Sequence, residues 1–535
     1  MMLTTLKKAA ARAAAALLAA VMLMSPALTV SAAGETKNLP GQEVFNSSIG
    51  SDVRFILRSY DKTIRLEWSA SSRPGLVGIK IRITNAGGAV VEEKNAGPGE
   101  GVYHFKNGVH GQRYTVRLTG VGSGGVVIFE NEASALFLDY SKLPALPLVN
   151  ITTDNDVEPT AREITPSDPG LFGKSITGND YVSGTVTITG LGQGQITSGM
   201  KIRVRGNTSA IGTDKLPYKI KLNDKLDLLG RGAGYANKDW ILLNTGYNLN
   251  TYMGDYIASV CGMEYVPQMR FVNVMLNGDW KGIYVLTEPV EEGSSRVKLD
   301  KSGYLFENDA YWWNEGGLYF RTSRQPYQMA YTFKYPDITG PNDPLCLQLK
   351  SYMQQAEDQI YQGTDRMFNY IDMDTFTGWI LARDILGTSD GAGSNVYFYK
   401  YDFNAANPGS SLIKMGPLWD FDSNFLIMNN WSEQHYADYL YFRQLFKKGK
   451  FAAAYVRRFQ QLYPGLEAGV ISHLDQLVAS QGAAIEESRQ LDRARWSYGY
   501  PSLTQEAATL KAFFHQQITW MYAHLQDVIN YSKQN

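Results

Sequence analysis

The sequence predicts a multidomain protein in which an all-β sandwich precedes an α+β domain with a helical second half. Three observations support this prediction. Residues 53–138 consist of short alternating apolar runs broken by Gly, Asn and Ser. Residues 148–288 continue in strand-like runs that include a clear hairpin turn, and after Pro344 the apolar residues recur at helical spacing. A change of hydrophobic period from two to about 3.6 is typical of a change from strands to helices.

The composition is that of an ordinary globular protein. The chain has 535 residues, of which 44% are hydrophobic and 19% are charged, and this length suits about two to four domains. The formal net charge is -1, so no basic surface indicates binding to nucleic acid. The six His residues include no close pair at metal-ligand spacing, which argues against a zinc site.

Residues 1–33 have the pattern of a secretory signal peptide. Lys7, Lys8 and Arg12 precede an apolar run at 13–24, and small residues at 30–32 offer a cleavage site. A membrane anchor is the alternative, but the apolar run is short for a spanning helix. We therefore expect bacterial-type export to the cell surface or the medium, with no transmembrane segment in the mature chain. Its formal charge would be about -4 once these three basic residues are removed.

The cysteine count excludes a disulfide scaffold. Cys261 and Cys346 are the two cysteines of the chain. They could pair in an oxidising compartment or remain as buried thiols, and we favour the thiols.

Residues 34–142 are predicted to form the β-sandwich. Trp68 should be buried between the sheets, and Tyr114 has the position of a corner tyrosine. The segment resembles a fibronectin type III domain, an immunoglobulin-like sandwich. It could bind carbohydrate or a cell-wall partner, but we favour a spacer because a fold alone does not define a function. The seven strand-like runs are 53–57, 63–68, 78–84, 90–93, 102–105, 114–118 and 126–130.

A proline-bearing linker at 143–147 leads to the second domain, which we place at 148–430. A glycine-bearing turn separates two of its strand-like runs, and its backbone N–H groups could close over phosphates. Lys219 and Lys221 follow on one face of the next strand, where an ammonium could point toward the same ligand. A plain hairpin with exposed lysines is the alternative. The runs are 148–152, 181–188, 200–205 and 218–222, and the turn contains Arg205, Gly206, Asn207 and Thr208.

The next segment predicts a strand, a helix and a hairpin. Residues 240–244 form a strand or buried turn, and 248–261 have helical spacing with Asn250 as a possible cap. Asn277 and Gly278 then predict a tight turn between strands at 270–276 and 280–288. The second strand runs through Glu288 into Pro289, where backbone groups could meet an adenine.

The remainder of the chain is mainly helical. We expect the second lobe of the domain to extend through a C-terminal helical part at 431–535. Amphipathic helices are predicted at 345–361, 374–386, 450–462, 465–483 and 503–531.

The candidate active site lies between 390 and 422. Asp390 and Asn395 are separated by four residues, and a second probable strand at 412–418 precedes Asp420 and Asp422. Phosphoryl transfer needs such a set, with one carboxylate to accept the proton of a hydroxyl and others to hold Mg²⁺. Taken alone, the pattern also fits a turn whose side chains cap their own backbone. A glycosidase fits less well, because two carboxylates two residues apart on a strand end face different ways.

Six motifs in this order resemble the spore-coat protein H (CotH) kinase family. The resemblance covers about residues 148–430. It implies an atypical protein-kinase-like fold, binding of ATP with Mg²⁺ or Mn²⁺, and phosphorylation of Ser or Thr in extracellular, coat or cell-wall proteins. The motifs lie at 203–209, 217–222, 240–243, 270–288, 395–400 and 416–422.

The resemblance also implies roles for individual residues. Asp390 would be the catalytic base, and Asn395 and Asp420 would be metal ligands with Asp422 as an auxiliary ligand. Lys221, or Lys219 as the competing choice, would contact the phosphates, and Asp255 is the nearest guess for the helix carboxylate that pairs with Lys221. The phosphate loop would comprise Arg205, Gly206, Asn207 and Thr208, and Glu288 would lie next to the adenine.

The chain departs from the family pattern in two places, and a second function stays open. The loop has Asn-Thr-Ser-Ala where Asn-Ser-Thr-Trp is common, and Arg383 and Asp384 stand where an Asn-Glu pair is usual. The alternative to an enzyme is a non-catalytic coat or surface protein that keeps the fold. We favour the enzyme because a scaffold needs none of Asp390, Asn395 and Asp420.

Overall fold

The structure is a computed structural model that describes most of the chain. It describes residues 47–49, 53–70, 73–192, 194–388, 395–421, 428–431 and 440–534. All of these belong to the unit that spans Asn38–Asn535. The predicted signal peptide at 1–33, Asp390 and Asp422 lie outside the described residues.

Two antiparallel sheets near the N-terminus confirm the predicted all-β region. Their orders are β1-β8-β7-β4-β5 and β2-β3-β6, and each of the seven predicted runs overlaps a strand. Trp68 is buried, and the Tyr114 hydroxyl accepts a hydrogen bond of 3.0 Å from the Val109 N–H, as a corner tyrosine does. The strands are β1 (Ser47–Ile49), β2 (Arg54–Tyr60), β3 (Thr63–Ser69), β4 (Leu76–Asn85), β5 (Val90–Ala96), β6 (Val102–Phe105), β7 (Arg113–Gly122) and β8 (Val127–Leu136).

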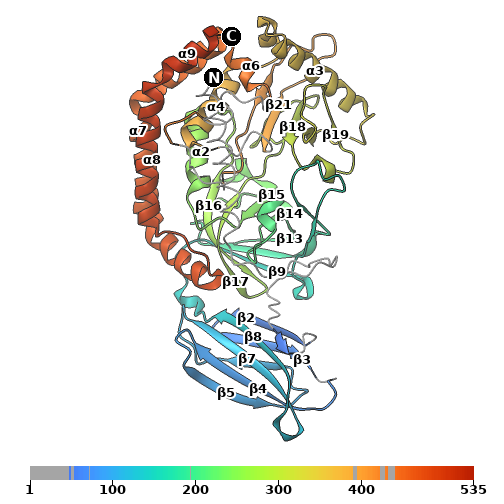
Figure 1. The fold of residues 1–535 in the computed structure, drawn as a ribbon, viewed down its shortest axis with the longest axis vertical. Coiled ribbons are helices and arrows are strands. Elements are labelled where there is room, and N and C mark those ends of the chain that lie inside the picture. The colour runs from blue at the N-terminus through green and yellow to red at the C-terminus, as the bar shows by residue number, and fades with distance from the viewer. Residues whose placement is uncertain are drawn as a thin grey trace, which may run out of the picture. The chain divides into compact units, whose positions relative to one another are not determined.

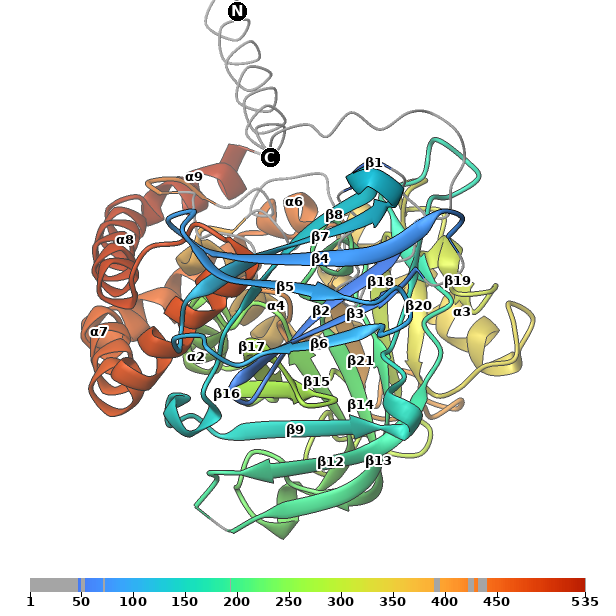
Figure 2. The same cartoon turned by 90° about the horizontal axis from the view of Figure 1, so that it is seen from below.

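The β-rich part of the second domain forms a closed barrel in the order β12-β13-β14-β15-β17-β16-β9 (Figure 2). Alternation decides which side chains fill it: Ile220 is buried inside the barrel, whereas Lys219 and Lys221 are on its outer face. A small sheet pairs β10 (Arg162–Ile164) with β11 (Ser175–Thr177). The barrel strands are β9 (Leu148–Thr153), β12 (Val182–Thr189), β13 (Ile196–Val204), β14 (Tyr218–Leu226), β15 (Asn237–Leu243), β16 (Met269–Leu276) and β17 (Asp279–Thr287).

The tight turn between β16 and β17 is as predicted. Asn277 and Gly278 have φ values of 51° and 75°, and this left-handed pair is what a two-residue hairpin turn requires. The helix before this hairpin, α2 (Asn250–Val260), also agrees with its predicted range. Its predicted cap is wrong: Asn250 lies inside the helix, and the N–H of Leu249 is bound by the Glu506 carboxylate at 2.8 Å.

The helical part surrounds a second sheet with the order β19-β20-β18-β21-β22 (Figure 1). Its strands are β18 (Tyr304–Asp309), β19 (Tyr319–Phe320), β20 (Ala330–Tyr335), β21 (Val396–Lys400) and β22 (Ile413–Met415). The helices are α3 (Pro344–Tyr361), α4 (Met373–Leu386), α6 (Phe442–Phe446), α7 (Gly449–Trp496), α8 (Leu503–Ala523) and α9 (Leu525–Gln534).

The C-terminal helices differ from the predicted ones. One helix was expected before Pro464 and another after it. Instead, α7 is a single helix of 48 residues that continues through Pro464. Pro464 and Gln460 are both exposed, so water can bind the Gln460 carbonyl that loses its helical partner. The single helix predicted at 503–531 is instead divided into α8 and α9 at His524.

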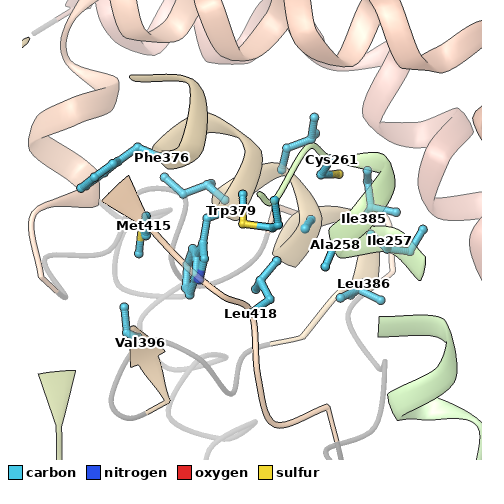
Figure 3. Packing of buried hydrophobic residues seen from close by; sticks show 14 of the residues in the cluster. Ile257, Ala258, Cys261, Phe376, Trp379, Ile385, Leu386, Val396, Met415 and Leu418 are labelled. Atoms are coloured by element: carbon cyan, nitrogen blue, oxygen red, sulfur yellow. The ribbon is translucent and has the colours of Figure 1, made fainter. Parts of the chain in front are cut away.

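The core of the helical part joins α2 and α4 to the ends of β21 and β22. Figure 3 shows Ile257 and Cys261 of α2 beside Ile385 of α4, with Leu418 packed below them. Cys261 and Cys346 are both buried free thiols, as we favoured. None of the helices in the described part of the chain is long and apolar enough to cross a membrane.

Candidate functional site

Asn395 and Asp420 lie side by side at one edge of the second sheet. Asn395 immediately precedes β21, and Asp420 follows the neighbouring antiparallel strand β22, so the register places both residues at the same edge. The Asn395 Nδ2 donates a hydrogen bond of 2.7 Å to Asp420 Oδ2. Both residues have left-handed backbone, with φ values of 58° and 64°, and both side chains are partly exposed. Such local strain is common where side chains must face a ligand.

Buried groups hold these two residues in place. The Asn395 N–H donates to Glu307 Oε1 at 3.1 Å. The Arg383 side chain is fully buried, and its Nη2 donates a 3.0 Å hydrogen bond to the carbonyl oxygen of Trp419, directly before Asp420. Arg383 and Asp384, where the sequence departs from the family pattern, are therefore part of the support of the site. The buried Asp384 carboxylate accepts a 2.6 Å hydrogen bond from the Tyr455 hydroxyl of α7.

Arg205 of the predicted phosphate loop lies near the ring of Trp419, the residue before Asp420. The guanidinium carbon lies 6.0 Å from the centre of the Trp419 ring. Arg205 is also close enough to Tyr397 to oppose the rise that burial causes in the pKa of that tyrosine. Gly206 has a φ of 96°, and a Cβ there would overlap Ser209 Oγ, so the turn requires glycine.

The other two loop residues take different directions. The Asn207 Oδ1 accepts a 2.7 Å hydrogen bond from Ser175 of β11. Thr208 is exposed. The structure thus places Arg205 near Trp419, whereas the Asn207 side chain is bound by β11.

The two candidate lysines have different surroundings. Lys219 lies opposite Ile241 in the β14–β15 register, and its Nζ forms an ion pair of 2.9 Å with Asp239. Ile241 in turn packs with Tyr397 and Trp419. Lys221 lies two residues further along β14 and is exposed. Lys219 is therefore the lysine beside the apolar cluster, although a role in phosphate binding stays a prediction for both.

Asp255, suggested by the sequence as the carboxylate partner of Lys221, has different surroundings from those expected. Asp255 lies on α2, and burial raises the pKa of its carboxyl well above the usual range. Among the residues that the structure describes, no lysine or arginine forms an ion pair with Asp255. The carboxylate that pairs with a candidate lysine is Asp239 of β15, which binds Lys219, and it was missed because the cross-strand pairing of β14 with β15 could not be read from the sequence.

Glu288 is occupied within the protein. Its fully buried carboxylate lies 2.6 Å from Arg231 and 3.3 Å from Arg296, and it also accepts a 3.0 Å hydrogen bond from the Gln268 N–H. Contact between Glu288 and an adenine stays a prediction. Val290, two residues further along the chain, is closer to the candidate site, because it packs with Ile241, Tyr397 and Trp419. Burial raises the pKa of Glu291 to about 7.

The oxygen donors of Asn395 and Asp420 suit a hard divalent cation. Carboxylate and amide oxygens are ligands that Mg²⁺ accepts, usually with water and substrate phosphates completing the shell. Within the described ranges, no group of three or more His, Cys, Asp or Glu side chains is placed to hold a metal ion. Asp390 and Asp422, the other two predicted members of the set, lie outside those ranges.

Comparison with known proteins gives one family. The model of the family described as "CotH kinase protein" matches residues 202–525, which is more than half of the chain. A search of curated proteins found no match. Among solved structures, the fn3 domain of human contactin 1 matches at 14% identity and a TM-score of 0.15, covering 21% of this chain and 92% of that one.

Proposed function

The chain belongs to the CotH kinase family, and from that premise we propose that it is a secreted, atypical protein kinase. It would transfer the γ-phosphate of ATP to Ser or Thr of extracellular, coat or cell-wall proteins, with Mg²⁺ or Mn²⁺. The observation that carries the proposal is the 2.7 Å pairing of Asn395 with Asp420, with Arg205, the residue after β13, near the ring of the neighbouring Trp419. Phosphoryl transfer depends mainly on positioning and charge neutralisation, and these residues supply groups for both.

The proposed division of labour follows the geometry. Asn395 and Asp420 would hold the metal, with Asp422 as a further ligand, and the bound metal would neutralise charge on the phosphates. Arg205 and the N–H groups of 206–208 would bind phosphate oxygens, together with Lys219 or Lys221. Asp390 would accept the proton of the substrate hydroxyl while the hydroxyl oxygen forms a bond to the γ-phosphorus. The bond between the γ-phosphorus and the bridging oxygen breaks at the same time, and ADP leaves with that oxygen.

An apolar surface is present for the base of the nucleotide. Ile241, Tyr397 and Trp419 form a cluster against which Val290 packs. This cluster lies beside Lys219 on one side and Asp420 on the other, since Trp419 immediately precedes Asp420 and Ile241 faces Lys219 across the strands. A flat aromatic ligand would gain both burial and aromatic contact there.

The test is binding of ATP to the full chain by titration calorimetry, with and without Mg²⁺. We expect metal-dependent binding that is abolished in Asp420→Ala, while Asp224→Ala, which removes an exposed carboxylate of β14, binds as the wild type does. Asp390→Ala should retain binding and lose transfer of labelled phosphate to dephosphorylated casein or to the chain itself. Unchanged MgATP affinity in Asp420→Ala would refute the metal assignment. If no metal supports binding by the wild type, the non-catalytic coat or surface protein becomes the better hypothesis.

A further inference from the structure

Gln517 is a buried amide in an apolar part of α8. Its side chain is fully buried. The other buried residues of this helix are apolar: Leu503, Ala507, Leu510, Phe513, Phe514, Ile518 and Met521. A leucine or methionine would fill the same space without polar atoms that need partners in the core. The hydrogen bonds of this amide therefore indicate what it contributes.

The amide of Gln517 joins two stretches of backbone. Its Oε1 accepts a 2.9 Å hydrogen bond from the Asn429 N–H. Its Nε2 donates hydrogen bonds of 3.0 Å to the Asn430 carbonyl and 2.9 Å to the Asp384 carbonyl. Because a side-chain amide has one carbonyl and two N–H donors, each polar group of Gln517 has a partner within the protein. The amide thus binds the end of α4 and the segment at 428–431 at the same time.

The chain on both sides of Asp420 is bound to neighbouring residues of α4. The Arg383 side chain donates to the carbonyl of Trp419, directly before Asp420. Asp384, the next residue of α4, is joined through the amide to the segment at 428–431, which follows Asp420 in the chain. Buried hydrogen bonds with satisfied partners make a structure more rigid. These two connections therefore limit how far this part of the chain can move relative to α4.

A second residue of α8 packs on the same segment. The rings of Trp431 and Trp520 are edge to face, with centroids 5.1 Å apart. Trp520 lies about one helical turn after Gln517. The Trp431 ring also lies 6.3 Å from that of Tyr455 of α7, whose hydroxyl donates to Asp384 Oδ2. The segment and the end of α4 are therefore held by the same two helices, and Gln517 bonds directly to both.

We propose that Gln517 is a positioning residue for phosphoryl transfer, an assignment that rests on the proposed kinase function. It keeps the segment that follows Asp420 in a fixed place against the end of α4, the helix that precedes Asp390 in the sequence. The rate of phosphoryl transfer depends mainly on how the base and the metal ligands are placed, so a residue that fixes this spacing acts on the rate. Nucleotide affinity depends on it less, because Asp420 stays paired with Asn395.

The variant that tests this role is Gln517→Met, which keeps the size of the side chain and removes its three hydrogen bonds. Transfer of labelled phosphate to dephosphorylated casein, or to the chain itself, is measured at a temperature where the variant is folded. We expect kcat to fall at least about tenfold, since misplacing reacting groups by about 1 Å can cost about a hundredfold in rate. The KM for MgATP should change by less than about threefold, which is the pattern of a lost transition-state interaction.

Two controls on α8 separate positioning from a general loss of stability. Gln516→Met makes the same change at the exposed neighbouring residue and should behave as the wild type does. Ile518→Val removes a buried methyl group from the residue after Gln517, so it should lower the melting temperature while kcat stays at the wild-type value. A loss of kcat in Ile518→Val as large as that in Gln517→Met would overturn the positioning role.

Hydrogen exchange, measured in peptides by mass spectrometry, gives a readout that does not need activity. The Asn429 N–H loses its acceptor in Gln517→Met, so it should exchange about five- to tenfold faster, the usual effect of one lost hydrogen bond, and Gln516→Met should show no change. Unchanged exchange at Asn429 would overturn the proposal, as would faster exchange combined with wild-type kcat. If the wild type transfers no phosphate to either acceptor, the proposed function fails and the role in transfer fails with it, although exchange at Asn429 still shows whether Gln517 holds the segment.

Discussion

Gly282 of β17 is required for a buried contact between the barrel and α7. Its φ is 113°, in the region that favours glycine, and a Cβ at this position would overlap the Asp492 Oδ1 of α7. Asp492 is fully buried: Oδ1 lies 2.7 Å from Lys215 Nζ and accepts a 3.1 Å hydrogen bond from the Ile283 N–H. A methyl group at position 282 would therefore displace the carboxylate from both partners.

The cost of Gly282→Ala follows from these contacts. A side chain held at positive φ costs roughly 1–2 kcal/mol. Moving Asp492 away leaves the Lys215 ammonium buried without its counter-ion, and breaking a buried pair in this way costs roughly 3–5 kcal/mol. We expect the free energy of unfolding to fall by about 4–7 kcal/mol, which approaches the total stability of a typical domain.

Urea unfolding followed by tryptophan fluorescence measures this loss, since Trp240, Trp280 and Trp379 are fully buried. Gly465→Ala in α7 is the control, because a Cβ there meets nothing within 4 Å. The control should be stabilised by about 0.5–1 kcal/mol, the usual gain when alanine replaces glycine inside a helix. An unchanged unfolding midpoint in Gly282→Ala would refute the described packing of α7 against β17.

Two further predictions concern buried ionisable groups. Arg383→Met removes the hydrogen bond to the Trp419 carbonyl, so we expect the free energy of unfolding to fall by about 2 kcal/mol. Half-saturation with ATP should also need more Mg²⁺, because Trp419 directly precedes Asp420. The same Mg²⁺ dependence in the variant and the wild type, measured by calorimetry, would contradict a positioning role for Arg383. Burial raises the pKa of Glu357 from 4.5 to about 7, so the folded state binds this proton more tightly than the unfolded state. Stability should therefore fall as pH rises from about 4.5 to about 7. Glu357→Gln should reduce the fall in unfolding free energy between pH 5 and pH 8 by roughly 2.5 kcal/mol, measured from urea unfolding curves at the two pH values. The same pH dependence in the variant would show that Glu357 is not protonated in the fold.

The sequence was most informative where local rules decide the structure. The corner role of Tyr114 and the turn at Asn277 and Gly278 depend on a few neighbouring residues, and both agree with the structure. Asn395 could be placed near Asp420 because each was expected at the end of a strand, and the two strands are neighbours in the sheet. Patterns with a fixed period or a fixed turn chemistry are readable without knowledge of the tertiary fold.

Pairings between distant residues could not be predicted in the same way. Glu288 is bound by Arg231 and Arg296, and Lys219 by Asp239, because strand register and loop packing bring them together. A charged residue in a sequence does not show whether its partner will be a ligand, water or another side chain. The prediction of a helix break at Pro464 was wrong for a related reason. The carbonyl of Gln460, which loses its helical partner, is on the exposed side of α7, and this exposure depends on the tertiary fold.

Helix α7 connects the two halves of the candidate site. Near its start, the Tyr455 hydroxyl donates to Asp384 at the end of α4, six residues before Asp390 in the sequence. Near its end, Asp492 holds Lys215, whose carbonyl accepts a 2.7 Å hydrogen bond from Asn244 Nδ2. The same Asn244 Nδ2 donates a 3.2 Å hydrogen bond to the carbonyl of Ser209, the residue that follows the predicted phosphate loop. One continuous helix therefore supports both the loop that carries Arg205 and the segment that leads to Asp390. Because a buried ion pair loses much of its value when one partner moves, this connection favours a fixed spacing between the predicted phosphate loop and the end of α4.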